Sequence, residues 1–277
     1  MVLDRQQEIR AQTERRLAEG RGKGFKEHYK PWIYVRDISS LGQSARIWSD
    51  KVGRVVQLLS QLEQHAFYLY EWSPSVVDIR EQFPLPLDST LALAQELGIA
   101  HPSKWGVPIV MTTDFLLTVD AGVGQKLLAR ALKYSWDCKP RTKELLHLER
   151  AYWETVGVDW RLVTERGVPG VVVGNVMSVR PMRNLPSYLP FSGYDIPRIA
   201  RALTDAVVQS DDVLAYCALR CDTDLGLGEG DSLAVARYLI ATRQWTVDMG
   251  VTIDPVQPLV LRSVALASGG ERRQGLA

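Results

Sequence analysis

The chain has 277 residues, 46% of them hydrophobic, and a formal net charge of +1. This length fits one large domain or two ordinary ones, and the hydrophobic fraction supports a buried core and excludes global disorder. The nearly neutral total does not indicate a general nucleic-acid binder, although residues 1–60 hold 12 Lys/Arg against 7 Asp/Glu, a local charge of +5.

The cysteines and the apolar runs indicate the compartment. Three cysteines, an odd and small number, argue against a disulfide scaffold and favour a reducing cytoplasm. Cys217 and Cys221 have no His or Cys cluster to complete a zinc site, so we interpret them as core residues. We expect neither a signal peptide nor a membrane span, because no stretch approaches the roughly 20 apolar residues that a span needs.

The first 50 residues predict a helix, a basic loop and two short strands. The helix covers residues 3–19, and the strands cover residues 33–35 and 45–48. The basic residues of the loop have aromatic residues between them and are Arg21, Lys23, Lys26 and Lys30. Such a run fits contact with DNA phosphates, and a solvated loop fits equally well.

A strongly patterned helix is predicted at residues 55–72, with Glu63 embedded in its broad apolar side. Residues 76–83 then alternate apolar and polar side chains, which predicts a strand with one wet face. Asp78, Arg80 and Gln82 would share that face. They are interpreted either as a structural ion pair or as a strip beside a substrate.

Residues 110–133 predict a β-hairpin, because two apolar segments flank a turn that contains glycine. Asp114 lies in the first strand, and Lys133 ends the second. Ala131 and Lys133 share one face, since side chains alternate along a strand. An isolated charge in an apolar strand must be paired, bound to a metal or placed at the sheet surface.

The remaining pattern predicts two domains. A helix at residues 139–156 and a strand at 160–164 complete an α/β unit, and we expect a catalytic domain over residues 1–166. Glycine and proline then become frequent, and a helical module follows. Its three helices and two short strands predict a winged-helix-like domain, so residues 167–277 are interpreted as a linker and a partner-binding domain.

Glu63, Asp114 and Lys133 are residue types that a metal-dependent nuclease needs. Hydrolysis of a phosphodiester requires an activated water and neutralised charge, and Mg²⁺ supplies both while using few carboxylate ligands. A lysine can orient the attacking water or offset developing negative charge. Acids and lysines are common, so these three residues are a weak signal by themselves.

Several blocks resemble the TnsA family, the endonuclease subunit of heteromeric cut-and-paste transposases. The blocks are Ala-Arg-Ile-Trp-Ser-Asp-Lys-Val-Gly-Arg-Val (45–55), Leu-Leu-Ser-Gln-Leu-Glu (58–63), Glu-Trp (71–72), Asp-Ile-Arg-Glu-Gln-Phe-Pro (78–84), Met-Thr-Thr-Asp-Phe-Leu (111–116) and Leu-Glu-Arg-Ala-Tyr-Trp (148–153). The resemblance covers roughly residues 15–165 in order, and the block at 78–84 is quite specific.

The resemblance implies a restriction-endonuclease-like, PD-(D/E)xK domain followed by a winged-helix-like domain. It implies catalysis by Glu63, Asp114 and Lys133, with Mg²⁺ or Mn²⁺ held by Glu63, Asp114 and the main-chain carbonyl of Leu132. It also implies cutting of double-stranded DNA at the 5′ ends of a transposon. The implied partners are a TnsB-like recombinase and a TnsC-like AAA+ ATPase.

One position departs from the family pattern. The family has a glutamine metal ligand two residues before the lysine, where this chain has Ala131, and a methyl group cannot coordinate Mg²⁺. Water can fill the vacancy, because Mg²⁺ retains several waters in proteins. Three alternatives stay open: Lys126 or Arg130 takes the part of Lys133, the chain is a non-catalytic adaptor, or it is a nuclease that works alone.

Overall fold

The structure is a computed structural model that describes residues 2–38 and 43–266. The chain forms two compact units, unit 1 (Met1–Val168) and unit 2 (Pro169–Ala277). No helix in the described ranges combines the length and the apolar character that crossing a lipid bilayer requires.

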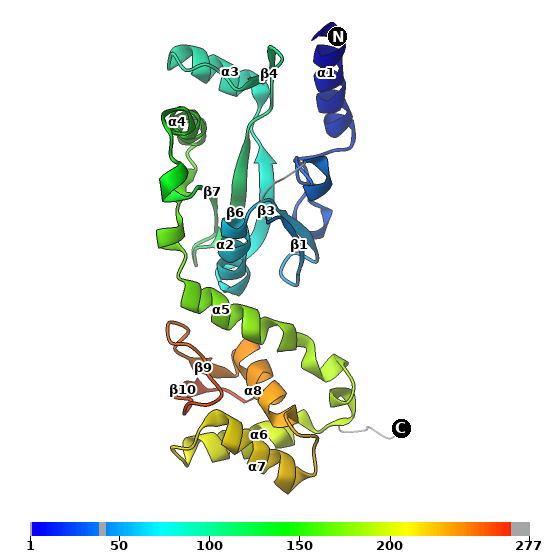
Figure 1. The fold of residues 1–277 in the computed structure, drawn as a ribbon, viewed down its shortest axis with the longest axis vertical. Coiled ribbons are helices and arrows are strands. Elements are labelled where there is room, and N and C mark those ends of the chain that lie inside the picture. Colours follow the sequence, from blue (N-terminus) through cyan, green and yellow to red (C-terminus); the bar gives the residue numbers. More distant parts are fainter. Residues whose placement is uncertain (1, 39–42, 267–277) are drawn as a thin grey trace. The chain divides into compact units, whose positions relative to one another are not determined.

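The centre of unit 1 is a four-stranded mixed sheet with the order β3–β6–β7–β8 (Figure 1). Its strands are β3 (Val76–Pro84), β6 (Thr112–Asp120), β7 (Gln125–Leu132) and β8 (Asp159–Val163). β3 and β7 run antiparallel to β6, which confirms the predicted hairpin, and β8 runs parallel to β7. Helix α4 (Pro140–Thr155) supplies the crossover to β8, because a tight turn cannot join parallel neighbours.

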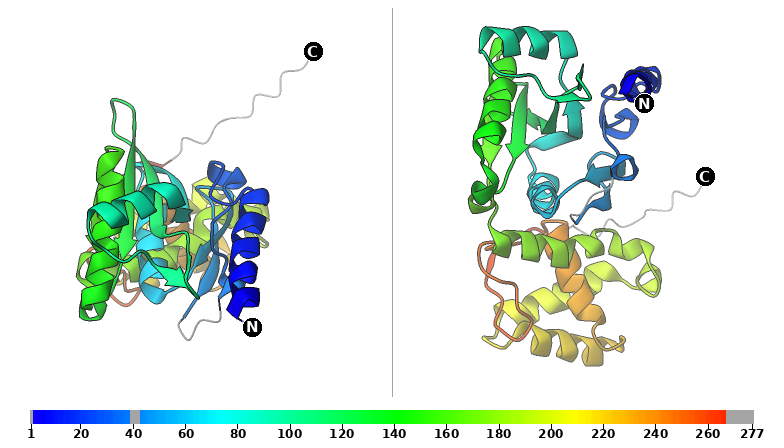
Figure 2. Two further views of the ribbon diagram at one scale, coloured as in Figure 1. Left: turned by 90° about the horizontal axis from the view of Figure 1, so that it is seen from above. Right: turned by 45° about the horizontal axis from the view of Figure 1, so that its top comes forward.

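The other elements of unit 1 surround this sheet. They are α1 (Val2–Ala18), β1 (Ala45–Ser49), β2 (Arg54–Leu58), α2 (Gln61–Trp72), α3 (Leu87–Glu96), β4 (Ser103–Lys104) and β5 (Val107–Pro108). β1 with β2 and β4 with β5 form separate antiparallel ribbons. Figure 2 shows α4 and the N-terminal segment with α1 at opposite sides of unit 1.

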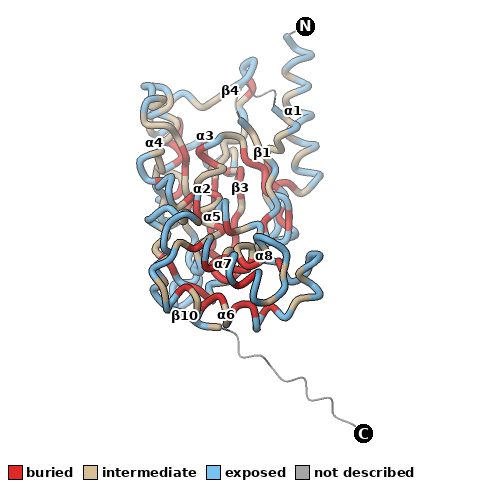
Figure 3. The backbone as a smooth tube through the Cα atoms, turned by 60° about the horizontal axis from the view of Figure 1, so that its bottom comes forward, coloured by how far each residue is buried: buried red, intermediate tan, exposed pale blue. Residues whose placement is uncertain are grey.

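Both faces of the sheet are covered, and strand alternation explains how. The ring of Phe115 packs edge-on against Tyr70 of α2, with ring centroids 5.3 Å apart. The next residue, Leu116, packs instead in a buried cluster with Trp153 of α4. Successive strand side chains point to opposite faces, so adjacent apolar residues bind two different helices to the sheet. In Figure 3, many residues of β3 and of the segments beside it are accordingly coloured as buried.

Two predicted elements are wrong in the segment before the sheet. The helix expected at residues 55–72 begins only at Gln61, and its first residues belong instead to strand β2. The β-branched Val55 and Val56 pair there with β1, and Ser60 caps the helix that follows. The strand expected at 33–35 is absent from the described structure, which has a short 3₁₀-helix at Val35–Asp37.

The wet face predicted for β3 is also wrong. Asp78 and Gln82 are buried, and Arg80 Nε lies 3.2 Å from Asp78 Oδ2, as the structural interpretation expects. The backbone N–H of Trp32 donates to the carbonyl of Gln82 at 3.1 Å, and that of Lys26 donates to Asp78 Oδ1 at 3.2 Å. A segment some 50 residues earlier therefore covers this face, which local alternation cannot reveal.

Unit 2 is helical with a small ribbon. Its elements are α5 (Gly170–Val179), α6 (Ile196–Val208), α7 (Leu214–Leu225), α8 (Asp231–Ala241), β9 (Trp245–Val247) and β10 (Leu261–Val264), with β9 and β10 antiparallel. The three helices predicted after residue 195 are confirmed. Leu203, Leu239 and Trp245 are fully buried, and Trp245 Nε1 donates to Thr204 Oγ1 at 3.0 Å, so the core of this unit satisfies its indole N–H.

Candidate active site

Glu63 lies in the first turn of α2 and is hydrogen-bonded to the N-cap residue of that helix, Ser60. Its backbone N–H donates to Ser60 Oγ at 3.2 Å, while its carboxylate accepts from the Ser60 hydroxyl and from the Leu59 N–H, both at 2.9 Å. Burial, followed by the charge of Asp114, raises the pKa of Glu63 to about 8. The local sequence thus fixes the direction of a carboxylate that is 6% exposed.

Asp114 lies in β6 and is anchored to the neighbouring strand. Its Oδ2 accepts from the backbone N–H of Leu132 at 2.6 Å, at the end of β7. Burial raises the pKa of Asp114, although the Leu132 hydrogen bond and the charge of Lys133 act in the opposite direction. Gln82 Nε2 lies 3.4 Å from Asp114 Oδ1 and 3.4 Å from Glu63 Oε2, so one amide joins the two acids.

Lys133 follows the last residue of β7. Its backbone N–H donates to the Val163 carbonyl at 3.1 Å, which continues the pairing with β8. The ammonium is 3.8 Å from Asp137 Oδ2, and the side chain is 39% exposed. It is close enough for its charge to favour ionised Asp114. Lys133 therefore occupies the solvent side of the site, whereas Glu63 and Asp114 occupy its floor.

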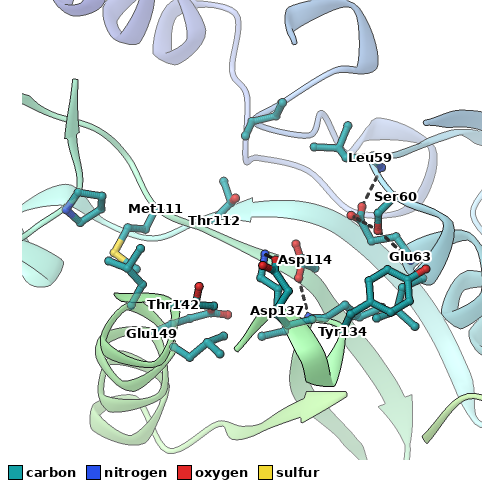
Figure 4. A pocket seen from close by; sticks show the side chains of 18 of the residues that line it. Leu59, Ser60, Glu63, Met111, Thr112, Asp114, Tyr134, Asp137, Thr142 and Glu149 are labelled. Atoms are coloured by element: carbon teal, nitrogen blue, oxygen red, sulfur yellow. Dashed lines mark hydrogen bonds and ion pairs between the residues drawn. The ribbon is translucent and has the colours of Figure 1, made fainter. Parts of the chain in front are cut away.

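These residues line a single cavity of about 630 Å³ in unit 1. Figure 4 shows Glu63, Asp114 and Glu149 around it. The residues that line the cavity bring four carboxyl groups, from Glu63, Asp114, Asp137 and Glu149, and one ammonium, from Lys133. Acidic side chains therefore outnumber basic ones in the lining of this cavity.

Glu149 is a candidate site residue that the sequence analysis missed. It lies in α4, is 6% exposed, and accepts from Thr113 Oγ1 at 2.8 Å and from Trp160 Nε1 at 3.1 Å. Burial, followed by the charge of Asp114, raises the pKa of Glu149 to about 8. In the sequence, Glu149 is visible only as an acidic residue beside the apolar face of a predicted helix. Many surface residues share that pattern.

The donor set fits a hard divalent cation. Glu63 is buried and Asp114 is half-buried, a cation would relieve the mutual repulsion of their carboxylates, and carboxylate oxygens are the ligands that Mg²⁺ prefers. In the described part of the chain, no three His, Cys, Asp or Glu side chains are gathered closely enough to hold a metal ion. A cation bound by this acid pair would therefore draw its further ligands from neutral oxygens or water.

The residues considered as substitutes for Lys133 lie elsewhere. Lys126 pairs with Val119 near the hairpin turn, and the Arg130 guanidinium donates to the carbonyl of Asp159 at 2.9 Å. Neither is among the residues that line the cavity. Ala131 does line it and is buried, so the position of the expected glutamine faces the site with only a methyl group.

The basic loop differs from the expectation at one residue. Arg21 is 4% exposed and donates to Glu19 Oε2 at 2.7 Å, to the Trp32 carbonyl at 3.0 Å and to Asp37. The proposed DNA contact by Arg21 is therefore wrong, because its guanidinium is already bound inside the fold. Lys23 and Lys30 are exposed and Lys26 is half-buried, so their contact with DNA stays a prediction.

Two protein-family models match consecutive parts of the chain. The model "TnsA-like endonuclease N terminal" matches residues 73–165, which include Asp114, Lys133 and Glu149, and "TnsA endonuclease C terminal" matches residues 168–249. The transposon Tn7 transposition protein TnsA of Escherichia coli is 42% identical over 165 residues. That alignment spans 60% of this chain and 60% of the relative's own length. The chain belongs to the TnsA family.

Proposed function

We propose that this chain is the DNA endonuclease subunit of a TnsA/TnsB/TnsC-type transposase. It hydrolyses a phosphodiester at each 5′ end of the transposon and so permits cut-and-paste transposition. The observation that carries this proposal is a pair of acids, the buried Glu63 and the half-buried Asp114, in a cavity with a lysine at its rim, in a chain of the TnsA family. The mixed sheet with flanking helices is compatible with a restriction-endonuclease-like fold for unit 1. For unit 2 we propose a winged-helix-like fold.

Glu63, Asp114 and the Leu132 carbonyl would hold Mg²⁺ or Mn²⁺. A bound divalent cation lowers the pKa of its water and offsets the charge of the phosphate. Carboxylates held in fixed positions favour such binding, because folding has already oriented the ligands. The short hydrogen bond from the Leu132 N–H fixes Asp114, and the hydrogen bonds from the Leu59 N–H and the Ser60 hydroxyl fix Glu63.

The position and the positive charge of Lys133 suit an interaction with the DNA substrate. Its ammonium is half-exposed at the cavity and lies 3.8 Å from the Asp137 carboxylate. A lysine so placed can orient the attacking water or stabilise the developing charge on the phosphate oxygens. Lys23 and Lys30 carry exposed ammonium groups that can contact the DNA backbone.

The proposed partners follow from the family. A TnsB-like recombinase cuts the strands that this subunit leaves intact, and a TnsC-like AAA+ ATPase engages unit 2. Both act with it on double-stranded transposon ends in the bacterial cytoplasm.

The test is cleavage of a labelled transposon-end duplex by the reconstituted three-protein complex in Mg²⁺. Asp114→Asn and Glu63→Gln are expected to lower the rate of 5′-strand cleavage at least about 100-fold, because each removes a charged cation ligand. Glu154→Gln is the matched control, since Glu154 lies on α4 and is exposed. Normal 5′-strand cleavage by both acid variants, with retained folding, would reject the assignment.

A second candidate function is a non-catalytic adaptor between recombinase and ATPase. The methyl group of Ala131 at the cavity favours it, because that side chain offers no ligand. An adaptor predicts cointegrates in place of simple insertions, with 5′ strands uncut even for the wild type. A stand-alone nuclease would instead cut DNA without either partner.

A further inference from the structure

Gln82 has the most unusual environment among the polar residues beside the acid pair. It lies within β3, yet its φ of +47° falls in the left-handed region. The register of β3 and β6 pairs Glu81 with Phe115 and Phe83 with Thr113, and it omits Gln82. This backbone conformation is unfavourable for a glutamine, and such outliers persist where the surrounding structure imposes them.

The surrounding structure holds both ends of Gln82. Its carbonyl accepts from the Trp32 N–H at 3.1 Å, and its side-chain Oε1 accepts from Thr112 Oγ1 at 3.2 Å. Its Nε2 is thereby directed at Glu63 and Asp114, 3.4 Å from each. With a residue exposure of 3%, the amide has little access to water in place of these partners.

The contacts of the amide are the longest that either acid makes. Glu63 accepts at 2.9 Å from Leu59 and Ser60, and Asp114 accepts at 2.6 Å from Leu132. Those shorter bonds fix the carboxylates, whereas the two bonds from Gln82 are the weakest and the easiest to exchange. The acids are therefore held more tightly by their other donors than by the amide of Gln82.

An amide offers opposite polarity at its two ends. In the structure the NH₂ group faces the acids, whose oxygens accept hydrogen bonds. A cation bound between the acids would repel that NH₂ group and attract the amide oxygen. Rotation about the last side-chain bond exchanges the two ends, and the Thr112 hydroxyl can serve both states because it can donate or accept.

We propose that Gln82 is a third side-chain ligand of the cation site, which turns its oxygen toward a bound cation and its NH₂ group toward Glu63 and Asp114 when no cation is bound. This inference rests on the proposed function, in which the two acids hold a divalent cation. It supplies the neutral side-chain oxygen that Ala131 does not provide. It also gives a reason for the left-handed backbone conformation of Gln82, because a residue in a regular strand conformation would not direct its amide at both acids.

The test is direct binding of Mn²⁺ to the purified full chain, measured by electron paramagnetic resonance of the free ion, without DNA or turnover. Gln82→Met keeps the length of the side chain and removes both polar ends, so it is expected to weaken Mn²⁺ binding at least about tenfold. Gln82→Glu keeps an oxygen ligand and adds charge, so it is expected to bind Mn²⁺ at least as tightly as the wild type.

Gln57→Met is the matched control. Gln57 is also buried, but its Oε1 accepts from the Val35 N–H and does not face the acid pair. This variant should bind Mn²⁺ like the wild type. If Gln82→Met weakens binding no more than Gln57→Met does, the Gln82 inference is overturned.

Thermal unfolding provides a second readout that does not require a bound ion at the start. In EDTA, Gln82→Glu should lower the melting temperature, because three acids then face one another without the amide donor between them. Added Mn²⁺ should raise that temperature by more than it does for the wild type. An equal Mn²⁺ response in both proteins also overturns the inference.

Failure of the proposed function gives a different pattern. If Mn²⁺ binding by the wild type is absent, or is unchanged in Asp114→Asn, the cation site itself is wrong and the Gln82 inference falls with it. If binding depends on Asp114 while Gln82→Met binds like the wild type, only the Gln82 inference fails.

Discussion

Replacing Glu149 by glutamine should make unit 1 more resistant to rising pH. Glu149 is 6% exposed, and its pKa is raised to about 8 by burial and by the charge of Asp114. Its Oε1 accepts from Thr113 Oγ1 and Trp160 Nε1, and a glutamine oxygen can accept both hydrogen bonds. The substitution therefore removes an ionisation and retains the contacts.

The magnitude follows from proton linkage. Between a pKa of 4.5 in the unfolded chain and about 8 in the folded protein, the folded state keeps a proton that the unfolded state has lost. The free energy of unfolding then falls by about 1.4 kcal/mol per pH unit from this group alone. Between pH 5 and pH 7 the wild type should lose about 3 kcal/mol that the variant keeps.

The assay is urea unfolding in EDTA at pH 5, 6, 7 and 8, followed by tryptophan fluorescence. Seven of the eight tryptophans precede residue 169, so the signal reports mainly on unit 1. Glu154→Gln, an exposed change on the same helix, should follow the wild type at every pH. A difference in stability between Glu149→Gln and the wild type that stays constant from pH 5 to pH 8 would refute the reasoning.

Three further substitutions have expected outcomes. Arg54→Met should lower the free energy of unfolding of unit 1 by about 3–5 kcal/mol, measured by urea titration, because it leaves the buried Glu81 carboxylate without the guanidinium that lies 2.6 Å away; unchanged stability would contradict this. Leu203→Ala should cost unit 2 about 2–5 kcal/mol while Mn²⁺ binding by unit 1 is retained. Lys133→Met should slow DNA cleavage at saturating Mg²⁺ and change stability by less than about 1 kcal/mol, since its ion pair is half-exposed; a rate equal to that of the wild type would exclude a role in catalysis.

Local pattern was sufficient where an element buries one face against its neighbours. The hairpin strands around Asp114 and the three helices of the C-terminal domain follow from periodicity and turn residues, and the structure contains both. Periodicity failed at residues 55–72, because an apolar run fits either a buried strand or a helix face. The cap residue Ser60 marks where strand β2 gives way to helix α2, a boundary that cannot be seen from the apolar pattern alone.

The candidate site divides in the same way. Sequence patterns and the family resemblance selected Glu63, Asp114 and Lys133, and the structure brings these three to one cavity. Neither indicated Glu149 as a site residue, since a helix accepts an acid at many positions. Arg21 was misjudged because a basic residue in a glycine-rich loop gives no sign that Asp37 will bind it inside the fold.

The sequence by itself determined which segments become strands and helices in most of the chain, because those preferences depend on neighbours a few residues apart. Only the tertiary structure decided the surroundings of Gln82, whose partners come from residues 19 and 32 positions away and whose backbone is held by Trp32. Burial and charge are properties of a site assembled from distant segments. The raised pKa values of the acids and the amide between them therefore exist only after β3, β6 and α2 have packed together.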